Sequence, residues 1–164
     1  MVEVLDLGFQ GAQRVIASFL LRTKEGPILI ETGPESTYPR LVAALGERGV
    51  APEEVRHVFV THIHLDHAGA AWRFAELGAT VYVHPKGASH LVDPSRLLAS
   101  AERIYGDGLK ALWGEVRGIP EERVRPLADG EVVEVGGVRV QALETLGHAG
   151  HHLSLIHISE PTRQ

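Results

Sequence analysis

Residues 61–69 read THIHLDHAG, which places three histidines and one aspartate within the six positions from His62 to His67. All four side chains are of types that bind divalent metal ions, and the carboxylate can also accept a proton. An apolar stretch precedes the segment and small residues follow it. The clustering therefore predicts a metal site of the hydrolytic kind rather than four separately solvated side chains.

The spacing also predicts how these ligands would be divided. Alternate residues of an extended chain face the same side, so His62 and His64 can share one ion at about 2.0–2.1 Å from each nitrogen. Asp66 and His67 are neighbours, and adjacent side chains diverge. We therefore expect these two residues to reach a second ion, about 3.5–4 Å from the first.

The composition narrows the class of protein. With 164 residues and 44% hydrophobic content, the chain is expected to be one domain or part of a larger one. A net charge of −5 argues against a nucleic-acid partner and leaves a small-molecule substrate as the expectation. The chain has no cysteine, so a metal site must use nitrogen and oxygen donors. The longest apolar run, Val15 to Leu21, is too short to span a membrane, and acidic residues near the start argue against a signal peptide; a cytoplasmic location is expected.

Apolar runs and turn residues predict an α/β chain that closes with a β-hairpin. The expected strands are residues 2–7, 15–22, 27–31, 55–61 and 80–84, and the expected helices are residues 36–48, 68–77 and 94–113, the last interrupted near residues 106–108. The hairpin joins residues 131–135 to residues 138–145 around two glycines.

A second histidine cluster, TLGHAGHH at residues 145–152, follows the last expected strand of the hairpin. Glycines on both sides of His148 allow a sharp turn that presents its ring. A third imidazole from a distant segment would complete a three-nitrogen site and leave one position open for water. That coordination is typical of catalytic rather than structural zinc sites.

Four segments together resemble the metallo-β-lactamase superfamily: ILIETG at residues 28–33, residues 61–69, VYVH at residues 81–84, and TLGH at residues 145–148. The resemblance covers most of the first 152 residues. It implies an αββα sandwich of which this chain carries the N-terminal half, with the second half truncated. The resemblance is nearest to the hydroxyacylglutathione hydrolase (glyoxalase II) branch.

The resemblance also implies roles for individual residues. His62, His64 and His148 would bind the first ion. Asp66 and His67 would bind the second, and Asp66 would also orient or deprotonate the attacking water. Zn²⁺ is the expected metal, with two ions in the full-length protein and iron or manganese as alternatives.

Three further residues are expected to support the site or contact the substrate. Glu31 stands where the family usually has aspartate. The longer side chain changes how the loop that contains Glu31 supports residues 61–69, the metal loop. His84 ends an expected strand beside the metal loop, and for this residue an ordinary exposed histidine is the favoured alternative. His152 matches a histidine that the family often carries four positions after the third ligand, where it holds a ligand in place.

The helical insert between Pro85 and Gly118 is expected to line a substrate groove, with Tyr105 and Trp113 among its candidate residues. The remaining apolar residues of the insert are assigned to helical core packing: Leu97, Leu98, Ile104 and Leu109.

The end of the chain departs from the family. A bridging aspartate and a last histidine would be expected downstream, and no aspartate follows Asp129. Residues 153–163 (LSLIHISEPTR) resemble the translation of a sequencing adapter. We therefore expect an incomplete domain over residues 1–152 and a non-native tail over residues 153–164. The alternative is an ordinary strand from Leu153 to Ile158.

The leading functional hypothesis is a metal-dependent hydrolase that directs a metal-activated water at an ester, thioester or related bond. The fragment is expected to be inactive as it stands, because the ligand set of the second ion is incomplete. One alternative is a phosphodiesterase of the same superfamily, which the acidic balance disfavours if the substrate is a nucleic acid. Another is a metal-binding module of a larger redox protein of the flavodiiron type.

Overall fold

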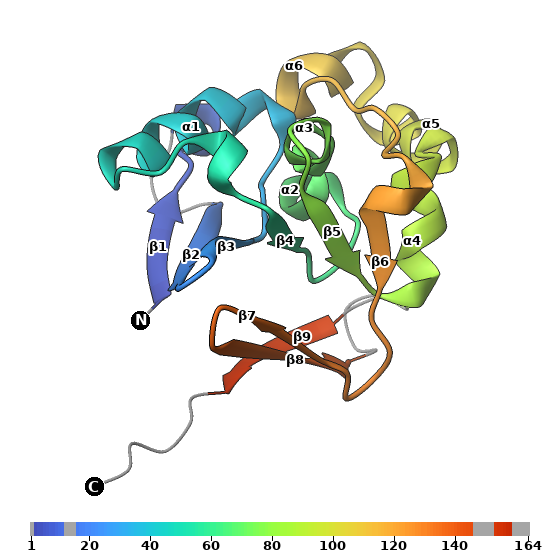
Figure 1. The fold of residues 1–164 in the computed structure, drawn as a ribbon. Helices are drawn as coiled ribbons and strands as arrows, with labels where there is room; N and C mark the ends of the chain where they lie inside the picture. Colours follow the sequence, from blue (N-terminus) through green and yellow to red (C-terminus); the bar gives the residue numbers. More distant parts are fainter. Residues whose placement is uncertain (1, 12–15, 146–152, 159–164) are drawn as a thin grey trace, which may run out of the picture.

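The computed structural model of the chain describes residues 2–11, 16–145 and 153–158. A six-stranded sheet forms its centre, in the order β1-β2-β3-β4-β5-β6 (Figure 1). The first three strands pair antiparallel, and β3 to β6 pair parallel. Its strands are β1 (Val2–Asp6), β2 (Ala17–Thr23), β3 (Gly26–Ile30), β4 (His57–Phe59), β5 (Thr80–Val83) and β6 (Val124–Pro126).

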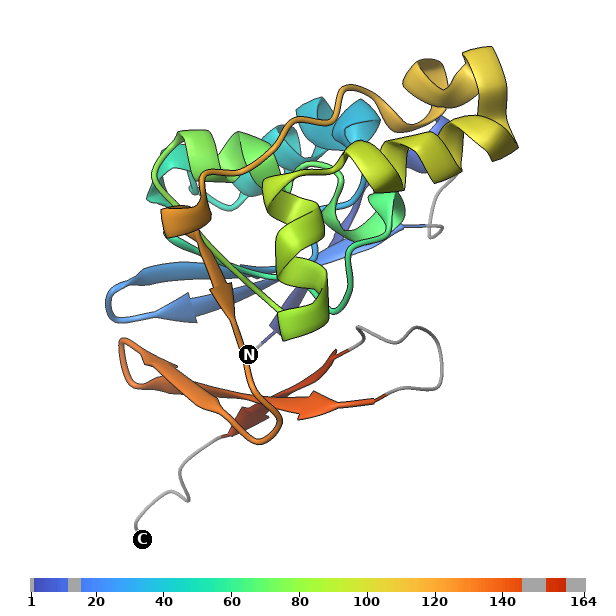
Figure 2. The same cartoon turned by 90° about the vertical axis from the view of Figure 1, so that its right-hand side faces the viewer.

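Helices cover one face of this sheet (Figures 1 and 2). They are α1 (Tyr38–Glu47), α2 (Leu65–Ala68), α3 (Ala71–Glu76), α4 (Pro85–Val92), α5 (Ser95–Tyr105) and α6 (Leu109–Trp113). Helix α1 shows why they dock there: Leu41 and Leu45, one turn apart on one face, are fully buried against the sheet. Gly49, with a φ of 73°, reverses the chain just after this helix. Every helix among the described residues is too short or too polar to cross a lipid bilayer.

A three-stranded antiparallel sheet lies against the other face (Figure 2). It consists of β7 (Val132–Val135), β8 (Val138–Glu144) and β9 (Leu153–Ile158). Phe59 and Tyr82 reach into the space between the sheets, where Leu153 and Val133 meet them. The described residues thus form a helix layer and two sheet layers. This α-β-β arrangement confirms the fold class expected for the N-terminal part of an αββα sandwich.

Most of the predicted strands are confirmed to within a few residues. The expected strand over residues 55–61 is shorter, because β4 ends at Phe59. Helix α4 and the short edge strand β6 were both missed. Leu153–Ile158 pairs with β8 as an ordinary strand, which is the alternative given for this segment. The origin of the tail stays a prediction.

The helix predicted over residues 68–77 is wrong at its start. The structure begins a helix at Leu65 and breaks the helical run at Gly69 and Ala70 into α2 and α3. Asp66 and His67 therefore stand on a helical turn instead of preceding one. The predicted break near residues 106–108 is confirmed, since α5 ends at Tyr105 and α6 begins at Leu109.

The parallel strands place the chemically interesting residues at one edge. Because β3, β4 and β5 run in the same direction, the segments that follow them emerge side by side. Glu31 follows β3, the histidine-rich segment follows β4, and His84 follows β5. The sheet therefore brings together residues that lie up to 53 positions apart, from Glu31 to His84.

Candidate metal centre

The segment after β3 and the segment after β4 hold each other in place. Thr32 donates its backbone N–H to the carbonyl of His67 at 2.8 Å, and its hydroxyl lies 3.1 Å from the same oxygen. The backbone N–H of Ala70 bonds to the carbonyl of Gly33 at 3.0 Å. These bonds hold α2 against the segment that follows β3. The backbone that carries the side chains of α2 is therefore fixed in position.

Three metal-binding side chains converge here. The ligand atoms of His62, Asp66 and His67 all lie within 4.8 Å of one another. The Nε2 atom of His67 lies 3.2 Å from a carboxylate oxygen of Asp66. The rings of His62 and His67 have centroids 4.0 Å apart. Residues expected to serve two different ions thus approach a common point.

His64 lies beside this group on the solvent side. Its ring centroid is 4.9 Å from that of His62, and the two rings stand nearly perpendicular, at 86°. His62 is buried whereas His64 is exposed. Strand alternation does not explain their approach, because β4 has already ended and His64 caps the start of α2. The proximity of the two rings was expected, but the local backbone that produces it was not.

The side chain of Glu31 holds two residues of the centre in position. Its carboxylate accepts the backbone N–H of Thr61 at 2.6 Å and also contacts the Nδ1 atom of His67. The side chain of Glu31 is almost fully buried, and its backbone φ is 64°, a left-handed value unusual for a residue with a side chain. The longer acid in place of the family's aspartate therefore joins both ends of the metal loop. Thr61, whose hydroxyl lies 2.9 Å from Nδ1 of His62, was not singled out from the sequence.

The charges of this group shift its pKa values. Burial lowers the pKa of His67, but the hydrogen bonds that the protonated ring donates to Asp66 and Glu31 outweigh burial and raise the pKa to about 10. Burial raises the pKa of Asp66, but the hydrogen bond and charge of His67 outweigh it, so the pKa lies below its usual value. Without a metal ion, the pair therefore holds a proton that a bound cation would displace.

The donor set fits a divalent metal ion. Two imidazoles and a carboxylate are the nitrogen and oxygen donors that zinc accepts, and ligands at about 2.0–2.1 Å from one ion lie about 3–4 Å apart. The 3.2 Å between His67 and Asp66 falls in that range. The Glu31 contact to Nδ1 of His67 directs the opposite nitrogen, Nε2, toward the centre. A carboxylate behind a histidine ligand is a common way to fix its orientation.

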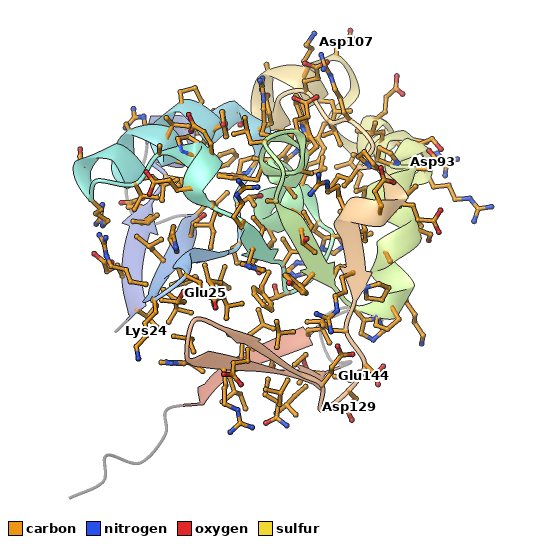
Figure 3. The ribbon with its side chains drawn as sticks, viewed as in Figure 1. Lys24, Glu25, Asp93, Asp107, Asp129 and Glu144 are labelled. Atoms are coloured by element: carbon orange, nitrogen blue, oxygen red, sulfur yellow. The ribbon has the colours of Figure 1, made fainter. Side chains whose placement is uncertain are left out.

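Two contacts join the second sheet to the edge of the first sheet that carries this centre. His84, almost fully buried, places Nε2 3.0 Å from a carboxylate oxygen of Glu144 at the end of β8. The backbone N–H of Glu144 bonds to Asp129 at 2.9 Å, and both lie at the same end of the second sheet (Figure 3). Leu153, the first residue of β9, donates its backbone N–H to the carbonyl of Thr61 at 2.7 Å.

The histidines expected from the second cluster, His148 and His152, lie outside the described residues. Their roles stay predictions. His84 lies at the sheet edge where it was expected, but its assignment as an ordinary exposed histidine is wrong, because it is only 3% exposed and contacts Glu144.

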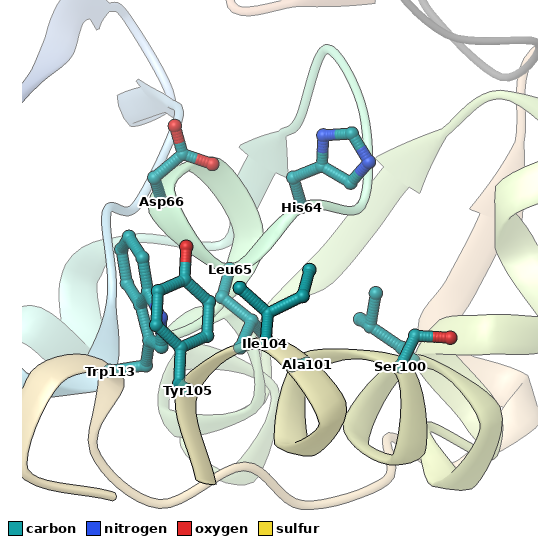
Figure 4. Close-up of a pocket in the computed structure, with 9 residues that line it drawn as sticks. His64, Leu65, Asp66, Ser100, Ala101, Ile104, Tyr105 and Trp113 are labelled. Atoms are coloured by element: carbon teal, nitrogen blue, oxygen red, sulfur yellow. The ribbon is translucent and has the colours of Figure 1, made fainter. Parts of the chain in front are cut away.

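A pocket opens beside the centre, and its lining includes His64 and Asp66 as well as residues of the helical insert (Figure 4). Tyr105 and Trp113 line it, as expected for a substrate groove. The assignment of Ile104 to helical core packing is wrong, because 75% of this residue is exposed and it lines the pocket. The amphipathic spacing of α5 indicated which residues share a face but not whether that face met the core or a cavity.

The layered fold and the histidine–aspartate centre at one sheet edge define an α/β protein built around a candidate metal site. A family model for the metallo-beta-lactamase superfamily matches residues 11–161. The chain belongs to this superfamily.

Two curated relatives illustrate the similarity. Metallo-beta-lactamase domain-containing protein 1 from Mus musculus is 38% identical over 91 residues, which cover 54% of this chain and 34% of the relative. An N-acyl homoserine lactonase from Bacillus cereus is 32% identical over an alignment of 80 residues that covers 35% of this chain and 32% of the lactonase. The chain therefore matches about a third of the length of each relative.

Solved structures share the fold. A metallo-beta-lactamase family protein from Thermus thermophilus superposes with a TM-score of 0.74 at 25% identity, over 94% of this chain and 55% of that protein. The described layers thus correspond to about half of a solved member of the superfamily.

Proposed function

We propose that the whole protein is a metal-dependent hydrolase that cleaves an ester, thioester or lactone bond. The observation that carries this proposal is the convergence of His62, Asp66 and His67 at the carboxyl edge of the parallel strands. The similarity to a lactonase supports a bond of the ester type. Because the chain matches only part of each relative, the activity is proposed for the whole protein, and the 164 residues alone are expected to give no turnover.

For the two metal ions we propose the ligands that the family resemblance implied. His62, His64 and His148 hold one ion, and Asp66 and His67 hold a second. The neighbourhood of the His62 and His64 rings supports the first set. His148 belongs to the segment between Glu144 and Leu153, and both of these residues are bonded to the edge that carries the centre. An imidazole-rich set of nitrogen and oxygen donors favours zinc over iron or manganese.

The residues around the ion have separate tasks. A divalent ion held by these residues would lower the pKa of a bound water to about 7 and so supply hydroxide at neutral pH. Asp66 orients the attacking water and accepts a proton from it, since its half-exposed carboxylate borders the pocket. Glu31 holds His67 and Thr61 so that the ligands stay in place before substrate arrives.

The experiment is ester hydrolysis by the whole protein with p-nitrophenyl acetate. We expect turnover to be lost after treatment with a chelator and to return on addition of zinc. His64→Ala should also lose turnover, whereas His90→Ala, a histidine on α4 outside the centre, should retain it. Turnover that persists in the chelated protein or in His64→Ala would contradict the proposal.

A further inference from the structure

The pocket beside the candidate metal centre has a volume of about 340 Å³ (Figure 4). This lies at the small end of the range of ligand sites, about 300–1,000 Å³. Nine residues line it: His64, Leu65, Asp66, Leu97, Ser100, Ala101, Ile104, Tyr105 and Trp113. They come from the metal loop and from helices α5 and α6, so the insert forms a wall of the centre.

The pocket is polar on the side of the metal centre and apolar on the side of α5. His64 and Asp66, from the candidate metal centre, form its polar border (Figure 4). Ala101 and Ile104, on one side of α5, provide an apolar surface opposite them (Figure 4). Leu97 of the same helix also lines the pocket. None of the nine lining residues is lysine or arginine. Away from the metal centre, the lining therefore has no lysine or arginine side chain to pair with a carboxylate or phosphate group, and it suits an uncharged apolar group.

The aromatic part of the wall is held in place before any ligand binds. Trp113 stacks on Phe9, with ring centroids 5.2 Å apart and planes inclined by 16°. Tyr105 meets Trp113 edge-on at 5.5 Å. Such pairs add about 0.5–1.5 kcal/mol beyond the area that they bury. The wall is therefore preorganised, which lowers the entropy that binding must remove.

The insert is also tied to the segment after β3. The hydroxyl of Ser36 donates to the carbonyl of Leu112 at 2.7 Å. The backbone N–H of Glu115 donates to the carboxylate of Glu35 at 2.8 Å, and that carboxylate also binds Arg73. These bonds join both the last turn of α6 and the chain after it to the scaffold of the metal loop. The distance between the apolar wall and the centre is thus set by the fold.

Ile104 leaves apolar surface exposed beside the pocket. It is 75% exposed, the largest exposed fraction among the large hydrophobic residues that are exposed in the described chain. A ligand that covers an apolar side chain at the border of a cavity removes its surface from water, and this makes the free energy of binding more favourable. Tyr105, also exposed, carries its hydroxyl toward the side of the pocket where Asp66 lies (Figure 4).

We propose that this pocket binds an aliphatic acyl chain of the substrate, with the scissile carbonyl placed at His64 and Asp66. The substrate class is then a medium-chain acyl ester, thioester or lactone. This inference rests on the proposed hydrolase function for the position of the carbonyl. The binding of the chain itself depends only on the pocket.

The first test measures binding of neutral aliphatic alcohols to the 164-residue chain by calorimetry. Ethanol, hexanol and decanol share a head group and differ in chain length. We expect affinity to rise about fourfold for each methylene that enters the pocket. Affinity that does not depend on chain length would overturn the proposal.

Two variants on α5 test whether decanol binds in this pocket. Ile104→Glu adds a carboxylate to the pocket lining, and Ala99→Glu adds the same charge at an exposed position of the same helix outside the lining. Both residues are exposed, so both variants should fold, which circular dichroism checks. We expect Ile104→Glu to weaken decanol binding at least tenfold and Ala99→Glu to leave it unchanged. Equal effects of the two variants would overturn the proposal.

Hydrolysis by the whole protein separates this inference from the proposed function. We expect kcat/KM to be higher for p-nitrophenyl decanoate than for p-nitrophenyl acetate, and Ile104→Glu to remove that preference. If decanol binds the pocket and no ester is cleaved, the hydrolase proposal fails and the chain-binding pocket stands. If both esters are cleaved equally and decanol does not bind, the pocket proposal fails and the hydrolase proposal stands.

Discussion

The carboxylate of Glu31 contacts Nδ1 of His67, so it is Nε2 of that ring that faces Asp66. The orientation of this candidate ligand is therefore set by a residue 36 positions earlier in the chain. Because the same carboxylate also binds the backbone of Thr61, one side chain controls both ends of the histidine-rich segment.

Glu31→Gln should weaken metal binding. The new amide would present an N–H group to Nδ1 of His67, so the proton of a neutral ring would move to Nε2 and block the ligand lone pair. We expect the affinity of the chain for zinc to fall by about 10–100-fold, measured by competition with a chromophoric chelator. Glu47→Gln, on the exposed side of α1, is the control and should bind zinc as the unmodified chain does. Equal affinities in the two variants would remove Glu31 from the centre.

Two glycines should respond oppositely to alanine. A Cβ atom at Gly69 would lie 2.5 Å from the carbonyl oxygen of Leu65 and 3.0 Å from Cα of Pro34, both backbone atoms. Gly69→Ala should therefore lower the free energy of unfolding by roughly 1–3 kcal/mol. Gly46, in α1, has open space around a new Cβ, and Gly46→Ala should raise the free energy of unfolding by up to about 1 kcal/mol. Urea unfolding of both variants measures these changes, and destabilisation by Gly46→Ala would contradict this account.

Phe59→Ala should produce a large loss of stability. Phe59 is fully buried between the two sheets and stacks on Tyr82, with ring centroids 4.4 Å apart. Removing a buried phenyl ring leaves a cavity, and we expect a loss of about 3–5 kcal/mol in the free energy of unfolding. Val4→Ala, at a residue 59% exposed on β1, should change it by less than about 0.5 kcal/mol. A small effect of Phe59→Ala would mean that the second sheet does not pack there in solution.

Acid should destabilise the protein partly through His57. Burial lowers the pKa of this histidine from 6.5, although the charge of Glu25 opposes the shift. Its Nδ1 atom lies within hydrogen-bond distance of the hydroxyl of Tyr82, at 2.8 Å. Because the folded-state pKa is the lower one, the unfolded chain binds the proton first, and stability falls as the pH drops below about 6.5.

His57→Gln should remove this part of the pH dependence. We expect the free energy of unfolding of the variant to fall less than that of the unmodified chain between pH 7 and the acid limit of folding. His90→Gln, on α4, serves as the matched control for loss of a histidine. A pH profile of His57→Gln that superposes on the unmodified profile would show that this ring does not titrate between the two states.

The general architecture followed from the sequence because its signals were local. Apolar runs ended by glycine or proline marked β1, β3 and β5, and the two glycines between β7 and β8 marked the hairpin. Helix α4 was missed because Pro85 was interpreted as the end of a strand, although proline is also favoured in the first turn of a helix. Strand β6 was missed because three residues carry too little periodicity to detect.

The candidate centre was predicted in composition but not in backbone. The ligand types were visible in residues 61–69, whereas their geometry depends on α2 beginning at Leu65 and on the bonds from Thr32. Those bonds join segments more than 30 positions apart, and sequence spacing does not encode them. The same reason explains Ile104: its helix was predicted, but the cavity beside it depends on tertiary packing.

The left-handed backbone of Glu31 has one more consequence, for how this position can vary. Glycine would adopt that φ without steric conflict, so Glu31→Gly should cost the backbone little while deleting the clamp on His67 and Thr61. Folding and metal chemistry therefore make opposite demands on a single residue, and only the second demand requires the acid. In random mutagenesis, selection for folding alone would therefore allow Glu31 to be replaced. Selection for metal binding would retain Glu31, together with its left-handed φ, because the carboxylate is needed.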